Sequence, residues 1–361
     1  MTETSSSDRT SVLLVHIVDE PDQHGGAEEV FLQLARFLAK QPEVVVTAAV
    51  NPGRVLNEAR AIPGVATEVL PDRQHPIRLA RSLPAIAREA KATAVGSHHR
   101  LTTWLLTRKR KSFVLLHTVH VFPQGRLRLS RWGDVTVCVS EDIRSRLVAE
   151  HRVPAKRTTT IINGVDDHGI RRREWAKNAP FRFAVIGRLC EQKGQETIVH
   201  AAARLRSGEE NFEILLVGDG PDAPVLRDMI AELKVEGTVQ MVGYRPVREV
   251  LPEVDAIVMP SRWEGTPLVL LEAWCAGIPV IASDIAGIRE HATSGEAVLV
   301  PADNTERFAE AMDAMIRSNE LRSRLSHAGR AKYESTFTLD RMGDAYLRLL
   351  TGRTQTTGVT K

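Results

Sequence analysis

The sequence predicts an α/β protein with two Rossmann-like domains, each built around a doubly wound parallel sheet. Apolar runs typical of strands buried on both faces alternate with amphipathic helical stretches along the chain. The chain has 361 residues, 43% of them hydrophobic, so it can bury more than one core. Ligands of such sheets bind beyond the carboxyl ends of the strands, so functional residues are expected in the loops there.

The first domain is expected over residues 11–165, after a disordered tail at 1–10. Its first strand leads through a glycine-containing loop into an amphipathic helix that ends near Ala39. Further helices are expected at Ile77–Lys91 and Glu141–Glu150. The expected strands are Ser11–Val18, Val44–Val50, Val65–Leu70, Thr93–Ser97, Phe113–Leu116, Val135–Val139 and Thr158–Ile162.

A polar and basic linker is expected over residues 166–180, because no apolar period runs through it. The second domain is expected over residues 181–338, and a tail over 351–361. The expected strands are Phe181–Ile186, Phe212–Val217, Val239–Gly243, Asp255–Met259, Pro279–Ala282 and Val298–Pro301. The expected helices are Leu268–Ala276, Glu306–Arg317, Leu321–Glu334 and a last one over Leu339–Leu350.

Composition argues against several classes of protein. The formal net charge of +3 is too small to indicate nucleic acid binding by itself. The three cysteines form no C-x-x-C pair, which argues against a disulfide framework or a zinc site and favours a reducing compartment. No apolar run approaches the roughly 20 residues that span a bilayer, and residues 1–10 lack the pattern of a signal peptide. We therefore expect a cytoplasmic protein without a nucleic acid partner.

The start of the expected helix at Leu268 carries the main functional signal. Thr266 is a favoured N-cap residue and Pro267 a favoured first helical residue. The backbone N–H groups of Leu268, Val269 and Leu270 would have no partner inside the helix, and with the helix dipole they form an anion site. Two carboxylates, Glu264 and Glu272, stand on either side of this helix start. A diphosphate at the helix tip, flanked by acceptors for hydroxyl groups, has the shape of a nucleotide sugar.

This segment resembles the E-x7-E signature of the retaining glycosyltransferases of family 4, which have the GT-B fold. Seven residues separate Glu264 from Glu272, and the matches continue at Ala273, Gly277, Pro279 and Val280. Other short segments also resemble the family: Gly25–Glu28, Thr118–His120, Ile162–Asp166 and the G-R-L-x3-K-G loop Gly187–Gly194. The resemblance implies two Rossmann-like domains that face a cleft between them, with the last helix crossing back onto the first domain.

The resemblance also implies how a nucleotide-sugar donor is held. Arg188 and Lys193 would bind the diphosphate, where fixed cations stabilise the charge that builds on the leaving group. Glu272 would accept hydrogen bonds from the ribose hydroxyls and Glu264 from those of the donor sugar. The remaining donor-binding residues would be Gly25, Gly26, Tyr244, Arg245, Gly265, Thr266, Pro267, Leu268 and Val269. No cofactor and no metal are expected, because the chain has no D-x-D pair and its cations take that role.

In the first domain the resemblance points to a histidine. His120, two residues after Thr118, would orient the transferred sugar and stabilise its oxocarbenium-like transition state, and it is favoured over His117. With His120, Glu264, Arg188 and Lys193 are the catalytic candidates. An acceptor pocket is a weaker expectation, and its candidate residues are Glu28, His98, His99, Arg100 and His117.

Two basic stretches allow two interpretations. One is residues 108–111, and in the other Arg126, Arg128 and Arg131 alternate with apolar residues. Such charge runs are usually solvated surface, but they also suit anionic lipid headgroups or a phosphate-bearing acceptor. The second interpretation predicts peripheral contact with the inner face of a membrane.

The predicted function is retaining transfer of a sugar from a nucleotide-diphosphate sugar, UDP- or GDP-linked, to a hydroxyl acceptor in cell-envelope or exopolysaccharide glycan assembly. The alternatives are glycosylation of a small secondary metabolite, epimerisation of a nucleotide sugar, glycoside hydrolysis by Glu264 and Glu272, and nucleotide-sugar binding without catalysis.

Overall fold

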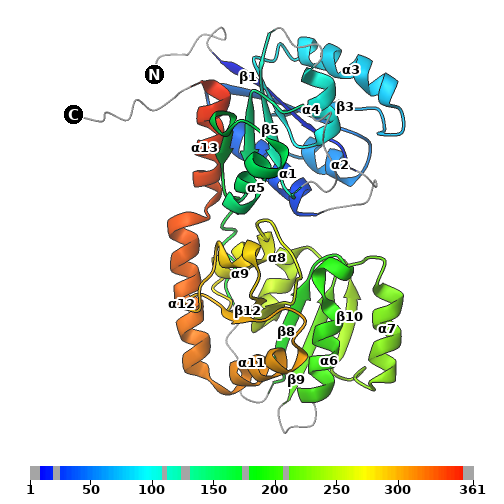
Figure 1. Cartoon of the computed structure of the whole chain (residues 1–361), viewed down its shortest axis with the longest axis vertical. Coiled ribbons are helices and arrows are strands. Elements are labelled where there is room, and N and C mark those ends of the chain that lie inside the picture. The colour runs from blue at the N-terminus through cyan, green and yellow to red at the C-terminus, as the bar shows by residue number, and fades with distance from the viewer. Residues whose placement is uncertain are drawn as a thin grey trace, which may run out of the picture. The chain divides into compact units, whose positions relative to one another are not determined.

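A computed structural model describes residues 9–18, 25–107, 112–122, 131–172, 179–205 and 211–352 of the chain. It divides into two compact units, the first made of Met1–Gly164 with Leu339–Lys361 and the second of Val165–Thr338. Each unit has its own parallel sheet with helices between the strands (Figure 1). The predicted class of two Rossmann-like α/β domains is confirmed. Within the described ranges, no helix is both long and apolar enough to cross a membrane.

The first unit holds seven parallel strands in the order β3-β2-β1-β4-β5-β6-β7. The strands are β1 (Thr10–His16), β2 (Val44–Val50), β3 (Val65–Val69), β4 (Ala94–Ser97), β5 (Val114–Val119), β6 (Val135–Cys138) and β7 (Thr158–Thr160). The helices are α1 (Gly26–Ala39), α2 (Arg54–Arg60), α3 (Pro76–Glu89), α4 (Arg100–Thr107), α5 (Glu141–His151), the short 3-10 helix η1 (Ala155–Arg157) and α13 (Leu339–Thr351).

The strand order of the first sheet reverses at β1, which pairs with β2 on one side and with β4 on the other. The carboxyl ends of β1, β4 and β5 are therefore neighbours at one edge of the sheet. A reversal of this kind is where doubly wound sheets bind ligands. The residues that follow these three strands are thus the first place to look for a site in this unit.

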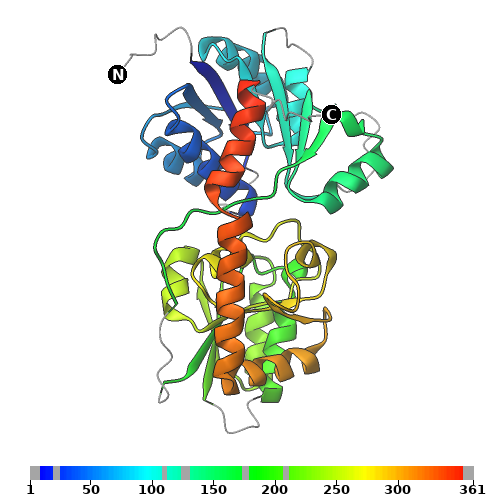
Figure 2. The same cartoon turned by 90° about the vertical axis from the view of Figure 1, so that its left-hand side faces the viewer.

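The C-terminal helix α13 is part of the first unit, where it packs against α1, β1 and β4. Figure 2 shows this helix in red, lying across the strands of the first sheet. Its Tyr346 is buried, and the hydroxyl of that tyrosine lies 3.1 Å from Thr118 Oγ1 on β5. A side chain from the end of the chain thus supports the strand that leads to His120.

The second unit holds six parallel strands in the order β10-β9-β8-β11-β12-β13. The strands are β8 (Phe181–Ile186), β9 (Phe212–Val217), β10 (Val239–Gly243), β11 (Ala256–Met259), β12 (Val280–Ser283) and β13 (Val298–Val300). The helices are α6 (Gln195–Leu205), α7 (Ala223–Glu232), α8 (Val247–Val250), α9 (Leu268–Cys275), α10 (Ala286–Arg289), α11 (Thr305–Arg317) and α12 (Asn319–Thr336), with the 3-10 helices η2 (Glu191–Lys193) and η3 (Leu251–Glu253).

Helix α9 lies inside the second unit, packed against β12 and α12. A helix that is apolar on nearly all sides must be buried, and the sequence LVLLEAWC fits this rule. Trp274 is fully buried, and its indole N–H donates to Glu296 O at 3.3 Å. The helix is therefore held firmly, and its N-terminus keeps a defined place at the carboxyl edge of the sheet.

Two predicted boundaries differ from the structure in ways that matter for the site. The strand expected to end at Leu116 continues to Val119, because its backbone goes on pairing with β6, so His117 and Thr118 lie within the sheet. The N-cap of α9 is Pro267 and not Thr266, since the extended ψ of 110° at Pro267 places it outside the helix.

Candidate functional site

The carboxyl edge of the second sheet brings Lys193 and Glu264 together. Lys193 ends the η2 turn after β8, and Glu264 lies in the loop between β11 and α9. Lys193 Nζ lies 2.5 Å from Glu264 Oε1, and Ser261 Oγ donates to the same oxygen at 2.7 Å. The Glu264 side chain is only 7% exposed and that of Lys193 is 23% exposed, so the carboxylate of this charge-assisted pair is shielded from water.

Close backbone approaches fix the loop that carries Glu264. Gly194 has a φ of +62°, and a Cβ there would lie 2.5 Å from Pro260 O. A Cβ on Gly287, at the start of α10, would lie 2.1 Å from the carbonyl oxygen of Glu264. Larger residues at either position would push this loop away, so both glycines are required for its present path.

Positive charge gathers at the same edge of the sheet. Arg188 is exposed, and across the described part of the chain its guanidinium has no hydrogen-bond or ion-pair partner. The backbone of Arg188 is held by Gln195, whose Nε2 donates to its carbonyl at 2.9 Å. Arg188 and Lys193 follow β8, and the N-terminus of α9 follows β11, the neighbouring strand. Because Lys193 is paired with Glu264, Arg188 and the tip of α9 are the groups whose positive charge favours an anion such as a diphosphate.

The tip of α9 differs in one detail from the prediction. The N–H group of Leu270, expected to be available to a ligand, donates to Pro267 O at 3.1 Å. Leu268 and Val269 remain as the first N–H groups of the helix. Glu272 is half-buried on the same helix. Gly265, Thr266 and Pro267 connect Glu264 to α9, and the last two of them are buried.

The loop after β10 holds the residues expected beside the nucleotide base. The Tyr244 ring is 42% exposed, and its backbone N–H donates to Asp219 Oδ2 at 3.1 Å. The guanidinium of Arg245 makes a two-fold contact with Glu253, at 2.9 and 2.7 Å. Tyr244 is therefore accessible, whereas the charge of Arg245 is compensated by Glu253.

In the first unit, polar side chains meet where β1, β4 and β5 end. His16 ends β1, His98 follows β4, and His120 follows β5. His16 Nε2 lies 3.1 Å from Glu28 Oε1, and the other Glu28 oxygen accepts the N–H of Gly25 at 2.9 Å. His98 Nδ1 lies 3.1 Å from His120 Nε2. Glu28 therefore ties the glycine loop at the start of α1 to the end of β1.

The electrostatics of these groups set their protonation states. Burial raises the pKa of Glu28, but the hydrogen bond to His16 and the electrostatic interaction with that ring outweigh burial and lower that pKa to about 2. Burial, followed by the charge of His120, lowers the pKa of His98 well below 6.5. Desolvation and then the charge of His16 lower the pKa of His120 to about 3. Near neutral pH, Glu28 is thus an anion, and both His98 and His120 are neutral.

The predicted acceptor residues occupy different environments. Glu28, His98 and His117 are buried, so their side chains face other side chains. His117 stacks on Trp132 with ring centroids 5.6 Å apart. His99 Nδ1 accepts the N–H of Leu101 at 3.1 Å at the start of α4, next to Arg100. Of the predicted acceptor residues, His99 and Arg100 have accessible surface. Gly26 on α1, a predicted donor-binding residue, is also exposed.

Several predictions fall outside the described residues, and several contacts were not predicted. The basic residues 108–111, Arg126 and Arg128 lie outside the described ranges, whereas Arg131 is described and exposed. His16 and Ser261 were missed. His16 stands at the end of the first apolar run, and Ser261 follows the strand before Glu264, so their places at strand ends were the available signal.

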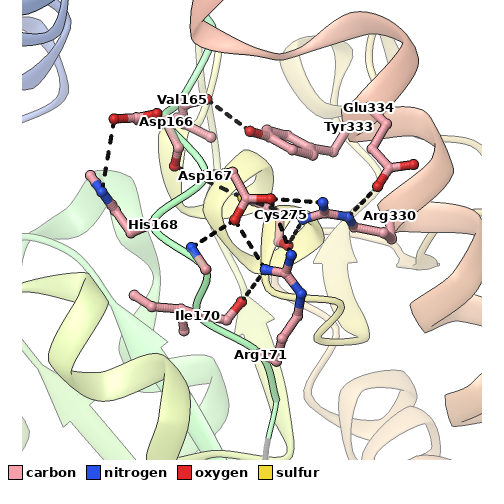
Figure 3. Close-up of polar contacts among 11 residues, drawn as sticks. Val165, Asp166, Asp167, His168, Ile170, Arg171, Cys275, Arg330, Tyr333 and Glu334 are labelled. Carbon is pink, nitrogen blue, oxygen red and sulfur yellow. Dashed lines mark hydrogen bonds and ion pairs between the residues drawn. The ribbon is translucent and has the colours of Figure 1, made fainter.

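A second polar cluster lies at the other end of α9 (Figure 3). Asp167 accepts hydrogen bonds from Gly169 N at 2.9 Å, from Arg171 Nη1 at 3.0 Å and from Arg330 Nη2 at 2.7 Å. The hydrogen bonds from Arg171 and then Arg330 lower the pKa of the Asp167 carboxyl. Arg330 also donates to Cys275 O at the end of α9. This cluster attaches the segment after Val165 to α9 and α12.

A cavity of about 190 Å³ opens beside this cluster, lined by Arg171, Arg172, Ala276, Gly277, Ser326, His327 and Arg330. The carbonyl groups at the end of α9 are satisfied there, Ala276 O by Arg172 N at 3.0 Å and Gly277 O by Ser326 Oγ. Two of its three arginines, Arg171 and Arg330, share Asp167, and the cavity lies at the C-terminus of the helix.

The comparisons with known proteins agree with the motifs. Residues 168–332 match the family described as Glycosyl transferases group 1, and residues 24–168 match Glycosyltransferase Family 4. Over 344 residues the chain is 30% identical to the lipopolysaccharide core biosynthesis glycosyltransferase LpsE of Rhizobium meliloti, covering 91% of this chain and 96% of LpsE. The chain belongs to the family 4 glycosyltransferases. Its matches to both family models span the two units described above.

Two further relatives of this glycosyltransferase are informative. The alpha-D-kanosaminyltransferase of Streptomyces kanamyceticus is 28% identical over 166 residues, which cover 44% of this chain and 42% of that protein. The crystal structure of Anabaena HepE in complex with UDP and glucose has a TM-score of 0.80 at 17% identity, covering 95% of this chain and all of HepE. At that identity the structural likeness speaks for the fold, which is GT-B.

Proposed function

We propose that this glycosyltransferase retains the anomeric configuration, uses no metal ion, and moves a sugar from a UDP- or GDP-sugar to a hydroxyl of a cell-envelope or exopolysaccharide glycan. The observation that carries the proposal is the Lys193–Glu264 pair at the same sheet edge as Arg188, whose guanidinium has no partner among the described residues. We propose further that residues 181–338 form the donor domain, that residues 11–165 form the acceptor domain, and that 166–180 link them.

The chemistry follows from the charges. As the bond between the anomeric carbon and the diphosphate oxygen breaks, negative charge builds on the diphosphate, and Arg188, Lys193 and the tip of α9 stabilise it. The acceptor oxygen bonds to the anomeric carbon on the same face, and its proton passes to the departing phosphate. Glu264 accepts hydrogen bonds from the sugar and Glu272 from the ribose. This route needs no carboxylate nucleophile, and the two cations supply the charge that a metal would otherwise provide.

The contacts of Glu264 weigh against glycoside hydrolysis. A hydrolase would use Glu264 and Glu272 as a proton donor and a nucleophile or base. Glu264 accepts from both Lys193 and Ser261 at one oxygen, which suits an acceptor of hydrogen bonds rather than a proton donor. In a hydrolase the exposed Arg188 would also have no diphosphate to bind. An epimerase would convert the donor with no acceptor present, so a product assay separates it from a transferase.

The relatives guide the choice of substrates. The likeness to LpsE, a lipopolysaccharide core biosynthesis glycosyltransferase, extends over nearly the whole chain and favours a cell-envelope acceptor. The kanosaminyltransferase match covers less than half of each protein, and it supports a small secondary metabolite as the second candidate acceptor. HepE, solved with UDP and glucose, supports a UDP-sugar as the first donor to test.

Helix α3 supports peripheral contact with an anionic membrane, and we infer that the enzyme works at its inner, cytoplasmic face. Arg78, Arg81 and Arg88 are exposed on α3, and in the described part of the chain none has an acidic partner. No acidic residue stands three or four positions from any of them, whereas Arg146 of α5 pairs with Glu150.

Ile77, in the first turn of α3, is 69% exposed. Unpaired arginines beside an exposed apolar residue suit a lipid surface. Sedimentation with anionic and with neutral vesicles tests this.

A donor panel tests the proposed reaction. Purified protein is incubated with UDP-, GDP-, ADP- and dTDP-sugars, with and without EDTA, and the release of nucleoside diphosphate is followed by mass spectrometry. We expect slow release from one donor, insensitive to EDTA and lost in Glu264→Gln and in Lys193→Met. The exposed Lys156 provides the control variant Lys156→Met, which should retain the activity.

Three results would overturn the proposal. Loss of activity with EDTA would mean that a metal is required. Release of sugar from a glycoside without any nucleotide would identify a hydrolase. If no donor releases nucleoside diphosphate and none shifts the melting temperature, the protein does not bind a nucleotide sugar at the proposed donor site.

A further inference from the structure

We propose that His98 is a positioning residue that fixes the tautomer of His120, so that His120 presents its Nδ1–H group as a hydrogen-bond donor to the substrate. The inference rests on the proposed function, in which His120 contacts the transferred sugar. It assigns to His98 a role different from the acceptor contact expected from the sequence. It also states which ring nitrogen of His120 carries the proton.

The contact between the two rings is direct. His98 Nδ1 and His120 Nε2 lie 3.1 Å apart, and the rings stack with centroids 5.2 Å apart and planes 29° from parallel. A neutral imidazole has one N–H donor and one bare nitrogen acceptor. A hydrogen bond between two such rings therefore contains one proton, which belongs either to His98 or to His120.

The surroundings of His98 decide between these two cases. His98 is 4% exposed, and its Nε2 is buried with no hydrogen-bond partner among the described residues. If the proton of His98 were on Nε2, a buried N–H would be left unsatisfied, which proteins avoid more strictly than an unused acceptor. The proton therefore belongs on Nδ1 of His98, which donates to Nε2 of His120. The single proton of His120 must then be on its Nδ1.

The neighbours of His98 hold its ring in place. The Phe31 ring meets His98 edge to face at 5.5 Å and stacks on His16 at 5.5 Å. His16 meets His98 edge to face at 6.3 Å and is itself tied to the Glu28 carboxylate. Side chains of two elements, His16 of β1 and Phe31 of α1, thus pack against the ring. A half-turn of the ring would leave this packing nearly unchanged, so the hydrogen bond to His120 is what fixes the position of Nδ1.

The consequence for His120 is chemical. With its Nε2 occupied by His98, the half-buried His120 ring offers Nδ1–H and no free acceptor. It can donate to a hydroxyl oxygen of a sugar, but it cannot take a proton from an acceptor at that nitrogen. A neutral donor also avoids placing a positive imidazolium beside an anomeric carbon that becomes positive in the transition state. His98 thus suits His120 to orienting the sugar in the transition state instead of to base catalysis.

The tautomer is tested in the wild-type protein, without any need for activity. Histidine labelled with 15N is incorporated, and long-range 1H–15N correlation spectra distinguish the two neutral tautomers, with His120→Gln identifying the signals. We expect His120 to carry its proton on Nδ1, and His98 to do the same. A proton on Nε2 of His120, or a charged His120 ring at pH 7, would overturn the inference.

Variants of His98 test its effect on the reaction. His98→Asn keeps an amide N–H near the place of Nδ1, and His98→Leu removes the donor. One hydrogen bond of about 1–1.5 kcal/mol corresponds to about tenfold in rate. We expect His98→Leu to lower kcat by about tenfold with the donor KM unchanged, and His98→Asn to restore most of that loss.

Phe31→Leu is the packing control, because it weakens the packing against the His98 ring but leaves the His98–His120 hydrogen bond in place. It should leave the tautomer of His120 unchanged. Equal loss of kcat in His98→Asn and His98→Leu would show that His98 serves packing alone. If the wild-type enzyme transfers no sugar from any donor, the proposed function fails, and the tautomer spectra still decide the present inference.

Discussion

The buried contact between Glu28 and His16 should have a measurable effect on the free energy of unfolding. The Glu28 side chain is buried, with one oxygen on His16 and the other on the N–H of Gly25. The substitution Glu28→Gln keeps the shape but turns an NH2 group towards one of these two donors. It removes the charge and one hydrogen bond together, and we expect the folded protein to lose stability.

The size of the effect follows from the pKa. The carboxyl titrates near 4.5 in the unfolded chain and at about 2 in the folded protein. At about 1.4 kcal/mol for each pKa unit, Glu28 contributes about 3 kcal/mol to the free energy of unfolding above pH 4.5. As the pH falls, the unfolded chain takes up the proton first, so the contribution declines from pH 4.5 towards 2. About 1 kcal/mol is left at pH 3.

The assay is urea unfolding at pH 7, 5 and 3 for the wild type, Glu28→Gln and a control. Glu29→Gln is the matched control, because Glu29 is the next residue on α1 and its half-exposed side chain pairs with Arg36 at 3.4 Å. Exposed pairs of this kind contribute about 0–1 kcal/mol. We expect the wild type to exceed Glu28→Gln by about 3 kcal/mol at pH 7 and by about 1 kcal/mol at pH 3.

A difference between wild type and Glu28→Gln that stays constant from pH 7 to pH 3 would refute the reasoning, because the effect would then not come from the carboxylate. A difference below about 1 kcal/mol at pH 7 would mean that the contact with His16 compensates only for the cost of burial.

Two further predictions concern the loop of the donor site and the C-terminal helix. Gly287→Ala should raise the KM for the donor at least several-fold and also lower the free energy of unfolding. The added Cβ would lie 2.1 Å from Glu264 O and displace the loop that carries Glu264. Gly237→Ala, where a Cβ meets nothing within 4 Å, is the control, and equal KM values in the two variants would contradict the prediction. Tyr346→Phe should lower the free energy of unfolding by about 1 kcal/mol, since it removes the buried bond to Thr118. Urea unfolding measures this, and an unchanged midpoint would mean that Thr118 finds another partner.

The sequence by itself determined the fold class and the positions of most strands along the chain. Strands such as Phe181–Ile186, Phe212–Val217 and Val239–Gly243 are found where they were predicted. The reason is local, because strands buried on both faces need continuous apolar runs, and such runs are visible in a single segment. The E-x7-E segment and the Gly187–Gly194 loop were readable for the same reason, since each motif lies within one short stretch of chain.

Strand ends were harder to predict than strand centres. His117 is polar and follows the apolar run at Leu116, which suggested a loop, but the strand continues to Val119 because β6 supplies backbone partners. The cost of burying the imidazole appears in the pKa of His117, which burial lowers to about 3. Pairing with a neighbouring strand overrode the local polarity there.

Only the tertiary structure decided which side chains meet. Lys193 and Glu264 are 71 positions apart, His98 and His120 are 22 apart, and Thr118 and Tyr346 are 228 apart. The first two pairs come together because parallel strands bring their carboxyl ends to one edge, and the strand order that chooses the neighbours is a property of the whole sheet. Tyr346 reaches Thr118 from helix α13, which packs on the first sheet. The sequence could therefore nominate His98 and Glu28 as polar residues at strand and helix ends. Their burial, and the partners that turn them inward, came from packing between segments distant in the chain.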